Sequence, residues 1–274
     1  MVNQDPGLAD NRLKAFGTRL RSLRKERGLT QAQLGELINY TGAFISYVEL
    51  AERRPPFMFA LRADAALESG DTLESLWWDL DQTSMLKGFF RYISFESKAV
   101  EIRRFEQGVI PGLLQVPAYT RALAHGAAQR GSITLDQAEE RAAVVMSRQR
   151  ILQRRSPPVC HFILDESCIR RPVGGPEAMK AQLTHLEQQA ALPNTTVQIA
   201  PFAIGEHRSF VWPATLLTLP DQSVLLYSES RLGSAMSRDA HEAAAWERDW
   251  RHLRDHSLSH EDSMTMIRTA QALL

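Results

Sequence analysis

Cysteine is scarce in this sequence: Cys160 and Cys168 are the only two among 274 residues. Two thiols eight residues apart form neither a disulfide framework nor a paired metal or redox motif, which excludes the small disulfide-rich secreted class. The sequence also lacks an apolar run near the roughly 18 residues of a membrane span. Its first residues lack the charged-then-apolar pattern of a signal peptide. We therefore expect a cytoplasmic protein with no membrane partner.

Net charge is absent as well, because 32 Lys and Arg balance 32 Asp and Glu, which excludes a uniformly basic coat for nucleic acid. Only five of the basic residues are Lys, a skew typical of GC-rich genomes, so the abundance of Arg alone does not indicate nucleic-acid binding. The charges are distributed unevenly, however. Residues 11–62 carry ten bases and four acids, whereas residues 63–81 carry six acids and no base. Local charge sets the potential that a phosphate backbone meets, although a solvated basic helix is the alternative.

The length predicts about two domains, and we place the boundary after residue 81. A first helix is predicted by Phe16, Leu20 and Leu23, which repeat at helical spacing before Gly28 ends it. The sequence Thr30-Gln31-Ala32-Gln33 then forms a capping box, in which the Thr hydroxyl and the second Gln amide satisfy N–H groups at a helix start.

The helix that begins there has apolar residues that we expect to face inward, namely Leu34, Leu37 and Ile38. Asn39 tolerates a left-handed backbone, so the chain can bend sharply there. A second short helix is predicted over residues 42–50, with Ile45 and Val48 buried and the small Gly35 where the two helices cross. This pattern predicts a helix-turn-helix, whose second helix would enter a DNA major groove N-terminus first.

Residues 30–55 resemble the DNA-binding domains of the Xre and phage-repressor family. The matching positions are the family's core residues, its acidic helix-end residue and its closing proline: Leu34, Ile45, Val48, Glu49 and Pro55. Further helices over about 56–67 and 72–79 would complete a five-helix, all-α domain. Ala51 departs from the family, which has Gly at this helix end. A left-handed Ala costs about 1–2 kcal/mol, so we expect this helix to end differently.

The resemblance implies contacts from the motif to DNA. Contacts to phosphates or to a base edge are expected from residues around the motif, namely Gln31, Arg53, Arg54, and Arg24 or Lys25. The positions that would read bases are Thr41, Gly42, Ala43, Phe44, Ser46 and Tyr47. Few of these side chains can make bidentate contacts to bases, so specificity would depend on thymine methyls, Tyr47 and DNA shape. A helical hairpin that contacts only protein is the alternative.

The remainder, residues 82–274, has a different pattern. Strands rich in β-branched and aromatic residues are predicted near 100–105, 159–164, 196–199 and 223–227. Helices are predicted from a capping box at Thr134 to about 155, over about 176–192, along an apolar stripe over 243–253, and from Ser259 onward. The four arginines at the end of the helix before residue 155 favour a structural role over a second DNA contact. The mixture predicts an α+β domain with a mixed sheet.

Five segments of this region together resemble the C-terminal domain of actinobacterial antitoxin-like Xre regulators, such as the WhiJ-like proteins of Streptomyces. They are residues 109–115 (VIPGLLQ), 148–152, 164–166, 182–186 and 227–229. The resemblance implies a transcriptional regulator whose C-terminal domain senses a ligand or a small partner protein encoded nearby. It carries over no catalytic residue.

Histidines and carboxylates offer the main alternatives in this domain. His252, His256 and His260 are spaced like metal ligands on a helix, but Ser259 starts a new helix, so only two of them share a face. Asp165-Glu166 follow a strand, where acids more often cap a helix or bind an Arg than catalyse. Loop residues that could edge a ligand or partner pocket are Glu206, His207 and Trp212. Because no phosphate-binding Gly-rich loop is present either, we expect no catalytic residue, no metal site and no cofactor.

These observations predict a sequence-specific DNA-binding regulator, associated with the nucleoid when bound. One small domain contacts few bases, so we expect a homodimer on double-stranded DNA with a pseudo-palindromic operator. The dimer contact would be the helix that holds Trp246 and Trp250, or a sheet edge. The second hypothesis is an antitoxin-like protein or small-molecule receptor that acts mainly through residues 82–274, and an enzyme is a distant third.

Overall fold

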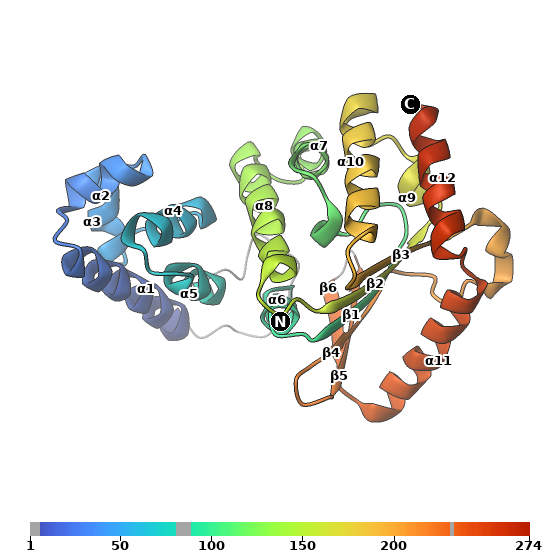
Figure 1. Cartoon of the computed structure of the whole chain (residues 1–274). Helices are drawn as coiled ribbons and strands as arrows, with labels where there is room; N and C mark the ends of the chain where they lie inside the picture. Colours follow the sequence, from blue (N-terminus) through green and yellow to red (C-terminus); the bar gives the residue numbers. More distant parts are fainter. Residues whose placement is uncertain (1–5, 81–88, 231–232) are drawn as a thin grey trace. The chain divides into compact units, whose positions relative to one another are not determined.

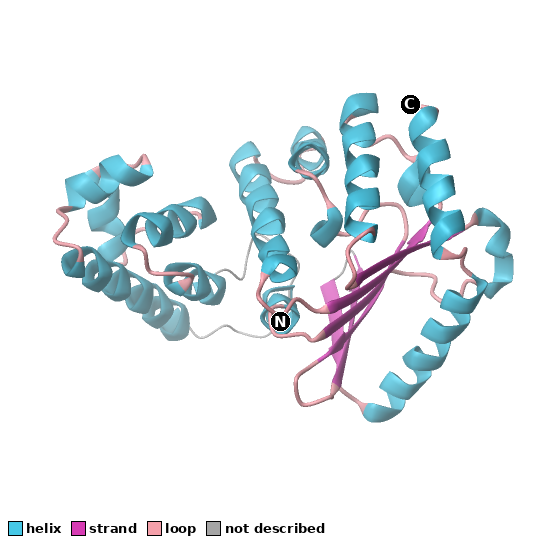
Figure 2. Cartoon of the chain, in the orientation of Figure 1, coloured by secondary structure: helices cyan, strands magenta, loops and turns pink. Residues whose placement is uncertain are grey.

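The computed structural model describes residues 6–80, 89–230 and 233–274 (Figure 1). The chain divides into two compact units between Met85 and Leu86, so the boundary expected after residue 81 lies outside the described residues. Figure 2 shows that the first unit is helical and that the second combines helices with a sheet. The expected fold class, all-α followed by α+β with a mixed sheet, is confirmed. Among the described residues, no helix has the length and apolar character needed to span a bilayer.

The first unit consists of five helices around a small apolar core. They are α1 (Pro6–Glu26), α2 (Gln31–Ile38), α3 (Gly42–Glu49), α4 (Phe57–Leu67) and α5 (Thr72–Leu80). The capping box at the start of α2 is confirmed, because Thr30 Oγ1 accepts from Gln33 N and Gln33 Oε1 accepts from Thr30 N. Phe16, Leu20 and Leu23 of α1 are buried as expected.

The three helices α1, α2 and α3 meet at glycines that leave no room for a side chain. A Cβ on Gly35 would lie 2.6 Å from the carbonyl oxygen of Tyr40, and one on Gly17 would lie 2.5 Å from that of Val48. The expectation that α2 and α3 cross at Gly35 is thus confirmed. The expectation for Leu37 is wrong, since 60% of this residue is exposed and only its neighbours Leu34 and Ile38 face the core.

Four successive helices of this unit end in a left-handed residue: Gly28, Asn39, Ala51 and Glu68, with φ of 67°, 60°, 60° and 50°. After α3, the N–H of Ala51 bonds to Val48 O (3.1 Å) and that of Glu52 to Tyr47 O (2.9 Å), the pattern of a Schellman motif. The expectation that this helix ends differently because Ala51 replaces a glycine is therefore wrong. The chain forms this left-handed helix end without a glycine and retains the conformational cost of a left-handed alanine.

Ala51→Gly is expected to raise the free energy of unfolding of the first unit by about 1 kcal/mol, because glycine adopts positive φ without the steric cost of a Cβ. The matched control is Ala65→Gly, an exposed position inside α4, which is expected to lower the same free energy by about 0.5–1 kcal/mol. Urea denaturation with hydrogen exchange, read by mass spectrometry on peptides of residues 11–80, measures both. A destabilising Ala51→Gly would contradict the assignment of strain.

The second unit contains a six-stranded mixed sheet with the strand order β3-β2-β1-β4-β5-β6. Its strands are β1 (Glu101–Glu106), β2 (Val159–Asp165), β3 (Thr195–Ala200), β4 (Ala214–Thr218), β5 (Val224–Ser230) and β6 (Gly233–Ser237). Strands β1, β2 and β3 run parallel, whereas β4, β5 and β6 pair antiparallel. The sheet is surrounded by α6 (Phe89–Glu96), α7 (Pro117–Gln129), α8 (Leu135–Arg148), α9 (Ser167–Arg170), α10 (Gly175–Ala190), α11 (Ala240–His256) and α12 (His260–Ala272), with short 3₁₀ turns η1 (Gly112–Leu114), η2 (Gln149–Gln153) and η3 (Phe202–His207).

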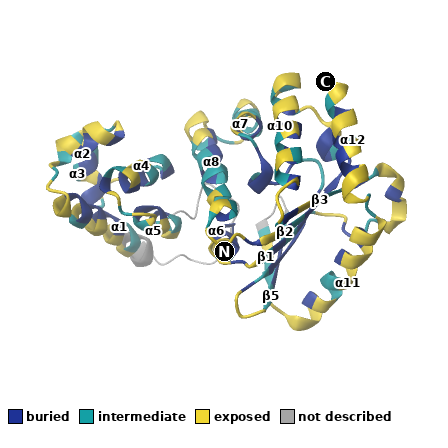
Figure 3. Cartoon of the chain, viewed as in Figure 1, coloured by how far each residue is buried: buried dark blue, intermediate teal, exposed yellow. Residues whose placement is uncertain are grey.

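The two faces of the sheet have different partners. On one face, Phe105 and Ile163 pack with Trp250 and Leu253 of α11 in an apolar cluster. On the other face, α10 packs against β3 and Tyr92 of α6 stacks on Tyr227 of β5, and α10 lies across the sheet from α11 in Figure 1. Figure 3 shows the strands largely buried between these layers, while the outer surfaces of α10, α11 and α12 are exposed.

Strand β1 lies in the interior of the sheet and sends consecutive arginines to opposite faces. Arg103 lies on the α11 face, where its Nη1 and Nη2 donate to the carboxylate of Glu247 at 2.5 and 2.6 Å. Arg104 lies on the opposite face, where its Nε and Nη2 donate to Glu106. The alternation of a strand therefore gives each arginine its own carboxylate.

The four predicted strands are confirmed as β1, β2, β3 and β5, and the Thr134 capping box at the start of α8 is also confirmed. The sequence patterns predict no helix or strand over the residues of α6, α7, β4 and β6. The helix expected to reach about residue 155 ends at Arg148, and η2 follows it.

Candidate nucleic-acid interface

The second motif helix, α3, presents a small and mostly apolar outward surface. Ala43, Tyr47 and Leu50 are exposed and follow one another at helical spacing, while Ile45 and Val48 face the core. Tyr47 is 49% exposed and has the largest ring on this surface. Leu50, which the sequence analysis did not select, is 56% exposed and continues the same stripe.

Of the other predicted reading positions, Thr41 is exposed, and Gly42, Phe44 and Ser46 are half-buried. Gly42 packs against α2, where a Cβ would lie 3.0 Å from the Cα of Ala32. The hydroxyl of Thr41 accepts from the N–H of Phe44 at 3.1 Å and caps α3. The half-buried ring of Phe44 contacts Phe59, with 5.5 Å between ring centroids. These three residues therefore position α3 within the unit. The outward stripe of α3 consists of Ala43, Tyr47 and Leu50.

Arg24 is not available to a DNA backbone. Its Nε and Nη2 donate to the two carboxylate oxygens of Glu49 at 2.6 and 2.8 Å, and its Nη1 donates to Leu29 O at 2.7 Å. The side chain is 9% exposed and that of Glu49 is 2% exposed. The hydrogen bonds that Arg24 donates to Glu49 raise the pKa of Arg24, although burial has the opposite effect. Of the two alternatives, Arg24 or Lys25, only Lys25 is exposed.

Gln31 is tied to the same carboxylate, since its Nε2 donates to Glu49 Oε2 at 2.9 Å. Glu49 at the end of α3 thus holds the end of α1 and the beginning of α2. This bond leaves the side-chain oxygen of Gln31 and the second N–H of its amide for other partners. Glu49, the acidic helix-end residue of the motif, therefore links α3 to α1 and α2 through hydrogen bonds.

Two exposed arginines follow α3. The guanidinium carbon of Arg53 lies 4.9 Å from the centroid of the Phe44 ring, and that of Arg54 lies 5.5 Å from the Trp77 ring. Stacking on an aromatic face orients a guanidinium. The described structure thus places two oriented cations directly after the exposed stripe of α3.

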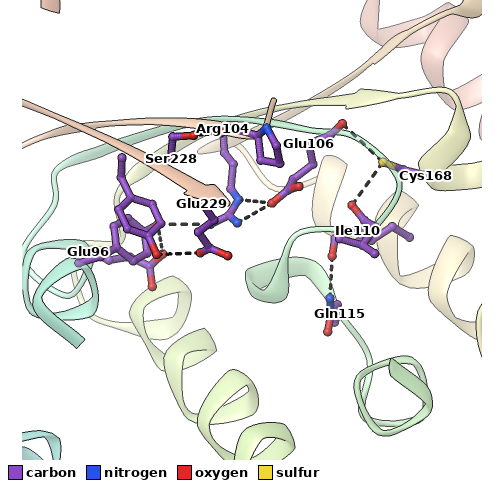
Figure 4. Close-up of polar contacts among 12 residues, drawn as sticks. Glu96, Arg104, Glu106, Ile110, Gln115, Cys168, Ser228 and Glu229 are labelled. Carbon is purple, nitrogen blue, oxygen red and sulfur yellow. Dashed lines mark hydrogen bonds and ion pairs between the residues drawn. The ribbon is translucent and has the colours of Figure 1, made fainter. Parts of the chain in front are cut away.

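The second unit contains a buried charge network that the sequence analysis missed (Figure 4). Glu96 of α6 accepts from Arg148 Nε and Nη2, both at 2.8 Å, and from the hydroxyl of Tyr92. The Arg104–Glu106 pair lies beside it, and Arg104 Nη1 also donates to the Tyr92 hydroxyl at 3.4 Å. The expected structural role of the arginines at the end of α8 is confirmed for Arg148, although its partner is a carboxylate rather than a helix end.

Electrostatics in this network are strongly coupled. Burial raises the pKa of Glu96, but the charge and hydrogen bonds of Arg148 outweigh burial and hold this pKa below its ordinary value. Burial also raises the pKa of Glu106, and Arg104 offsets only part of that effect. The attraction of Glu96 raises the pKa of Arg148, although burial opposes it. In this network, the charged state of each buried group therefore depends on the charge of its partner.

Three of the five segments that carry the second resemblance meet inside this unit. The run over residues 109–115 forms a loop around η1, and glutamine side chains hold its carbonyl groups. Gln115 Nε2 donates to Ile110 O at 2.6 Å, Gln149 Nε2 to Gln115 O at 2.6 Å, and Gln182 Nε2 to Leu114 O at 2.7 Å. These residues thus have structural roles in the observed fold.

The candidates for catalysis are accounted for by structural contacts. Asp165 accepts from Ser167 N at 2.9 Å and pairs with Arg208, and Glu166 pairs with Arg170, so the expected Arg-binding role is confirmed. Glu166, the N-cap residue of α9, makes no side-chain capping bond. Burial raises the pKa of the Cys160 thiol to about 12 and that of Cys168 further still. Both thiols are therefore protonated at neutral pH, which disfavours a thiolate nucleophile.

The three residues selected as a possible pocket edge lie in the connection between β3 and β4, and all are exposed. Glu206 and His207 end η3, and Trp212 follows with 49% of its surface exposed. Gly205 precedes them at φ 54° and ψ −129°, a conformation that only glycine adopts readily. The His207 ring stacks on His256 of α11 with 4.4 Å between centroids.

Comparison with known proteins gives two family matches. A model described as a helix-turn-helix domain matches residues 15–77, which include most of α1 and all of α2–α4. A model described as a domain of unknown function (DUF5753) matches residues 89–269, well over half of the chain. No curated protein and no solved structure matches the chain.

Proposed function

The chain belongs to the family defined by the domain of unknown function DUF5753 and also has a helix-turn-helix domain, and we propose that it is a sequence-specific regulator of transcription. One observation carries this proposal: an outward stripe on α3, centred on Tyr47, is followed by the exposed and oriented Arg53 and Arg54. On a helix-turn-helix, this arrangement suits insertion of α3 into the major groove with cations on the flanking phosphates.

Specificity in this proposal depends on contacts other than bidentate hydrogen bonds. Ala43 and Leu50 offer apolar contacts to thymine methyl groups, and the Tyr47 hydroxyl can bond to a base edge or a phosphate. The exposed Lys25 takes the phosphate contact for which Arg24 is unavailable. Sequence-dependent DNA shape supplies the remaining discrimination.

The finer proposals concern assembly and subtype. We place the protein among the WhiJ-like, actinobacterial Xre regulators, and we propose that it binds a pseudo-palindromic operator as a homodimer. Trp250 is 2% exposed and belongs to the core of its own unit, so its ring does not supply the dimer contact. The remaining candidates are the rest of α11, which includes Trp246, and the two sheet edges, β3 and β6, since each edge strand pairs with one other strand in the described structure.

The second unit is proposed to sense a small partner protein or ligand. The observation that favours this role is the set of large apolar residues exposed in the β3–β4 connection: Phe202, Val211 and Trp212, at 61%, 57% and 49%. Exposed large apolar residues are enriched at binding surfaces.

Fluorescence anisotropy tests the DNA proposal directly. The full-length chain is titrated onto the intergenic DNA upstream of its own gene and onto a scrambled duplex, at several salt concentrations. Selective binding that weakens as salt rises is the expected result. Equal affinity for both duplexes, without a partner present, would contradict sequence-specific binding by the chain alone.

Two substitutions separate backbone contacts from readout. Arg53→Ala is expected to weaken binding similarly on all sequences and to reduce the slope of log K against log salt by about one, because one phosphate contact is lost. Tyr47→Ala is expected to cost roughly 1–3 kcal/mol on the operator and much less on scrambled DNA. Arg155→Ala, an exposed arginine of the second unit, serves as the control. Equal losses on both duplexes for Tyr47→Ala would remove this residue from readout.

A further inference from the structure

Three histidines from two separate segments come together on the surface of the second unit. His252 and His256 lie one turn apart near the end of α11, and His207 ends η3. One ligand atom of each imidazole lies within 4.8 Å of those of the other two. The sequence predicts no metal site, because His260 is expected on a different helix from His252 and His256. His260 does start α12. The third histidine comes instead from a loop about 45 positions earlier in the chain.

The protein holds these rings on a rigid base. Ile204 and Phe210, on either side of His207, are buried in the same apolar cluster as Trp250 and Leu253 of α11. Packing in this cluster fixes η3 against α11, so the two segments reach the surface together. Gly205, with its glycine-specific backbone, turns the chain between Ile204 and His207.

One of the rings is already oriented for ligation. His256 Nδ1 lies 2.8 Å from the carbonyl oxygen of His252, and because a carbonyl oxygen can only accept, Nδ1 carries the proton. The Nε2 atom of a neutral His256 is then the free electron-pair donor. A backbone carbonyl that fixes the tautomer in this way is the usual outer partner of a metal-bound histidine.

We propose that His207, His252 and His256 form a binding site for a divalent transition-metal ion, with Zn²⁺ as the favoured occupant. Imidazole suits Zn²⁺, Cu²⁺ and Ni²⁺, whereas Mg²⁺ and Ca²⁺ prefer oxygen ligands. Zn–N bonds of about 2.0–2.1 Å place tetrahedral ligand atoms about 3.3 Å apart. The exposed rings approach one another by an ångström or so to reach this spacing. Three protein ligands leave the fourth position open to water or to a group from a partner.

Co²⁺ binding tests the site without any assay of DNA binding. The full-length, tag-free chain is treated with chelator, desalted and titrated with Co²⁺. We expect one ion per chain with the strong visible absorption of four-coordinate Co²⁺, displaced by Zn²⁺ but not by Mg²⁺. Added Zn²⁺ is also expected to raise the Tm of the second unit, because it binds the folded state.

Single variants decide whether all three rings are ligands. His207→Ala, His252→Ala and His256→Ala are each expected to weaken binding by more than the roughly 10–100-fold that loss of an outer-shell partner costs. His241→Ala and His260→Ala, at exposed positions in the first turns of α11 and α12, are the matched controls and should leave the affinity unchanged. Circular dichroism confirms that each variant is folded.

Two outcomes would overturn the proposal. An unchanged affinity in His207→Ala would leave only the pair on α11, which is an ordinary surface chelate. Retention of the cobalt spectrum by the variant that lacks all three histidines would place the ion elsewhere.

Discussion

Replacing Glu49 by alanine is expected to lower the free energy of unfolding of the first unit by about 3–5 kcal/mol, because it leaves the guanidinium of Arg24 buried without its carboxylate. Both side chains are almost fully enclosed, and two hydrogen bonds join them. Gln31 loses its partner as well. Urea denaturation, followed by hydrogen exchange in peptides of residues 11–80, measures the loss within this unit.

Glu52→Ala is the matched control, since this glutamate is exposed just beyond α3 and its loss should change stability by less than about 0.5 kcal/mol. The double variant Arg24→Met with Glu49→Leu provides a second arm. Apolar residues of similar volume often replace a buried ion pair without loss, so this variant should recover most of the stability that Glu49→Ala removes. A mild effect of Glu49→Ala alone would show that water reaches Arg24.

Arg148→Ala is expected to destabilise the second unit by about 3–5 kcal/mol, since it removes both guanidinium donors from the buried carboxylate of Glu96. The arginine side chain is 6% exposed and that of Glu96 is 2% exposed, so water does not replace the lost partner. The same hydrogen-exchange measurement on peptides of α6, α8 and β1 reports this loss. Arg155→Ala, seven residues later and exposed, is the control and should have little effect.

Glu96 also gives this unit an acid dependence of known sign. Its pKa is lower in the folded state, so it stabilises the fold above the ordinary glutamate value of 4.5, and this contribution disappears as the pH falls through the lowered pKa. Glu96→Gln should remove that part of the pH profile. The comparison isolates Glu96 from Glu106, whose raised pKa contributes with the opposite sign. Identical profiles below pH 4.5 in both proteins would contradict the role of Glu96.

Local signals account for what the sequence predicts well. The capping boxes at Thr30 and Thr134 and the left-handed Asn39 act within a few residues, so they identify helix ends without knowledge of the tertiary fold. Strands β4 and β6 lack such signals, because each has five residues and depends on a neighbouring strand for its hydrogen bonds.

The residues of the candidate sites show the same limit. Arg24 and Lys25 are adjacent basic residues, and only the distant Glu49 decides which one is buried. Leu37 fits an apolar helical stripe but is exposed, because the short helix α2 buries only the narrow side that includes Leu34 and Ile38. His207 has no sequence relation to His252 and becomes its neighbour only through the packing of η3 on α11.

The paired arginines of β1 have a consequence for how the chain finds its fold. A slip of this strand by one residue would turn Arg103 away from Glu247 and would send Arg104 into the apolar cluster around Trp250. A slip by one residue turns every side chain of a strand to the other face, and a guanidinium misplaced in this way loses its counter-ion and its water together. The two arginines thus specify the register of β1. A sheet with a slipped β1 is destabilised by its unpaired charges, which disfavours its persistence as a kinetic trap or as a seed for aggregation.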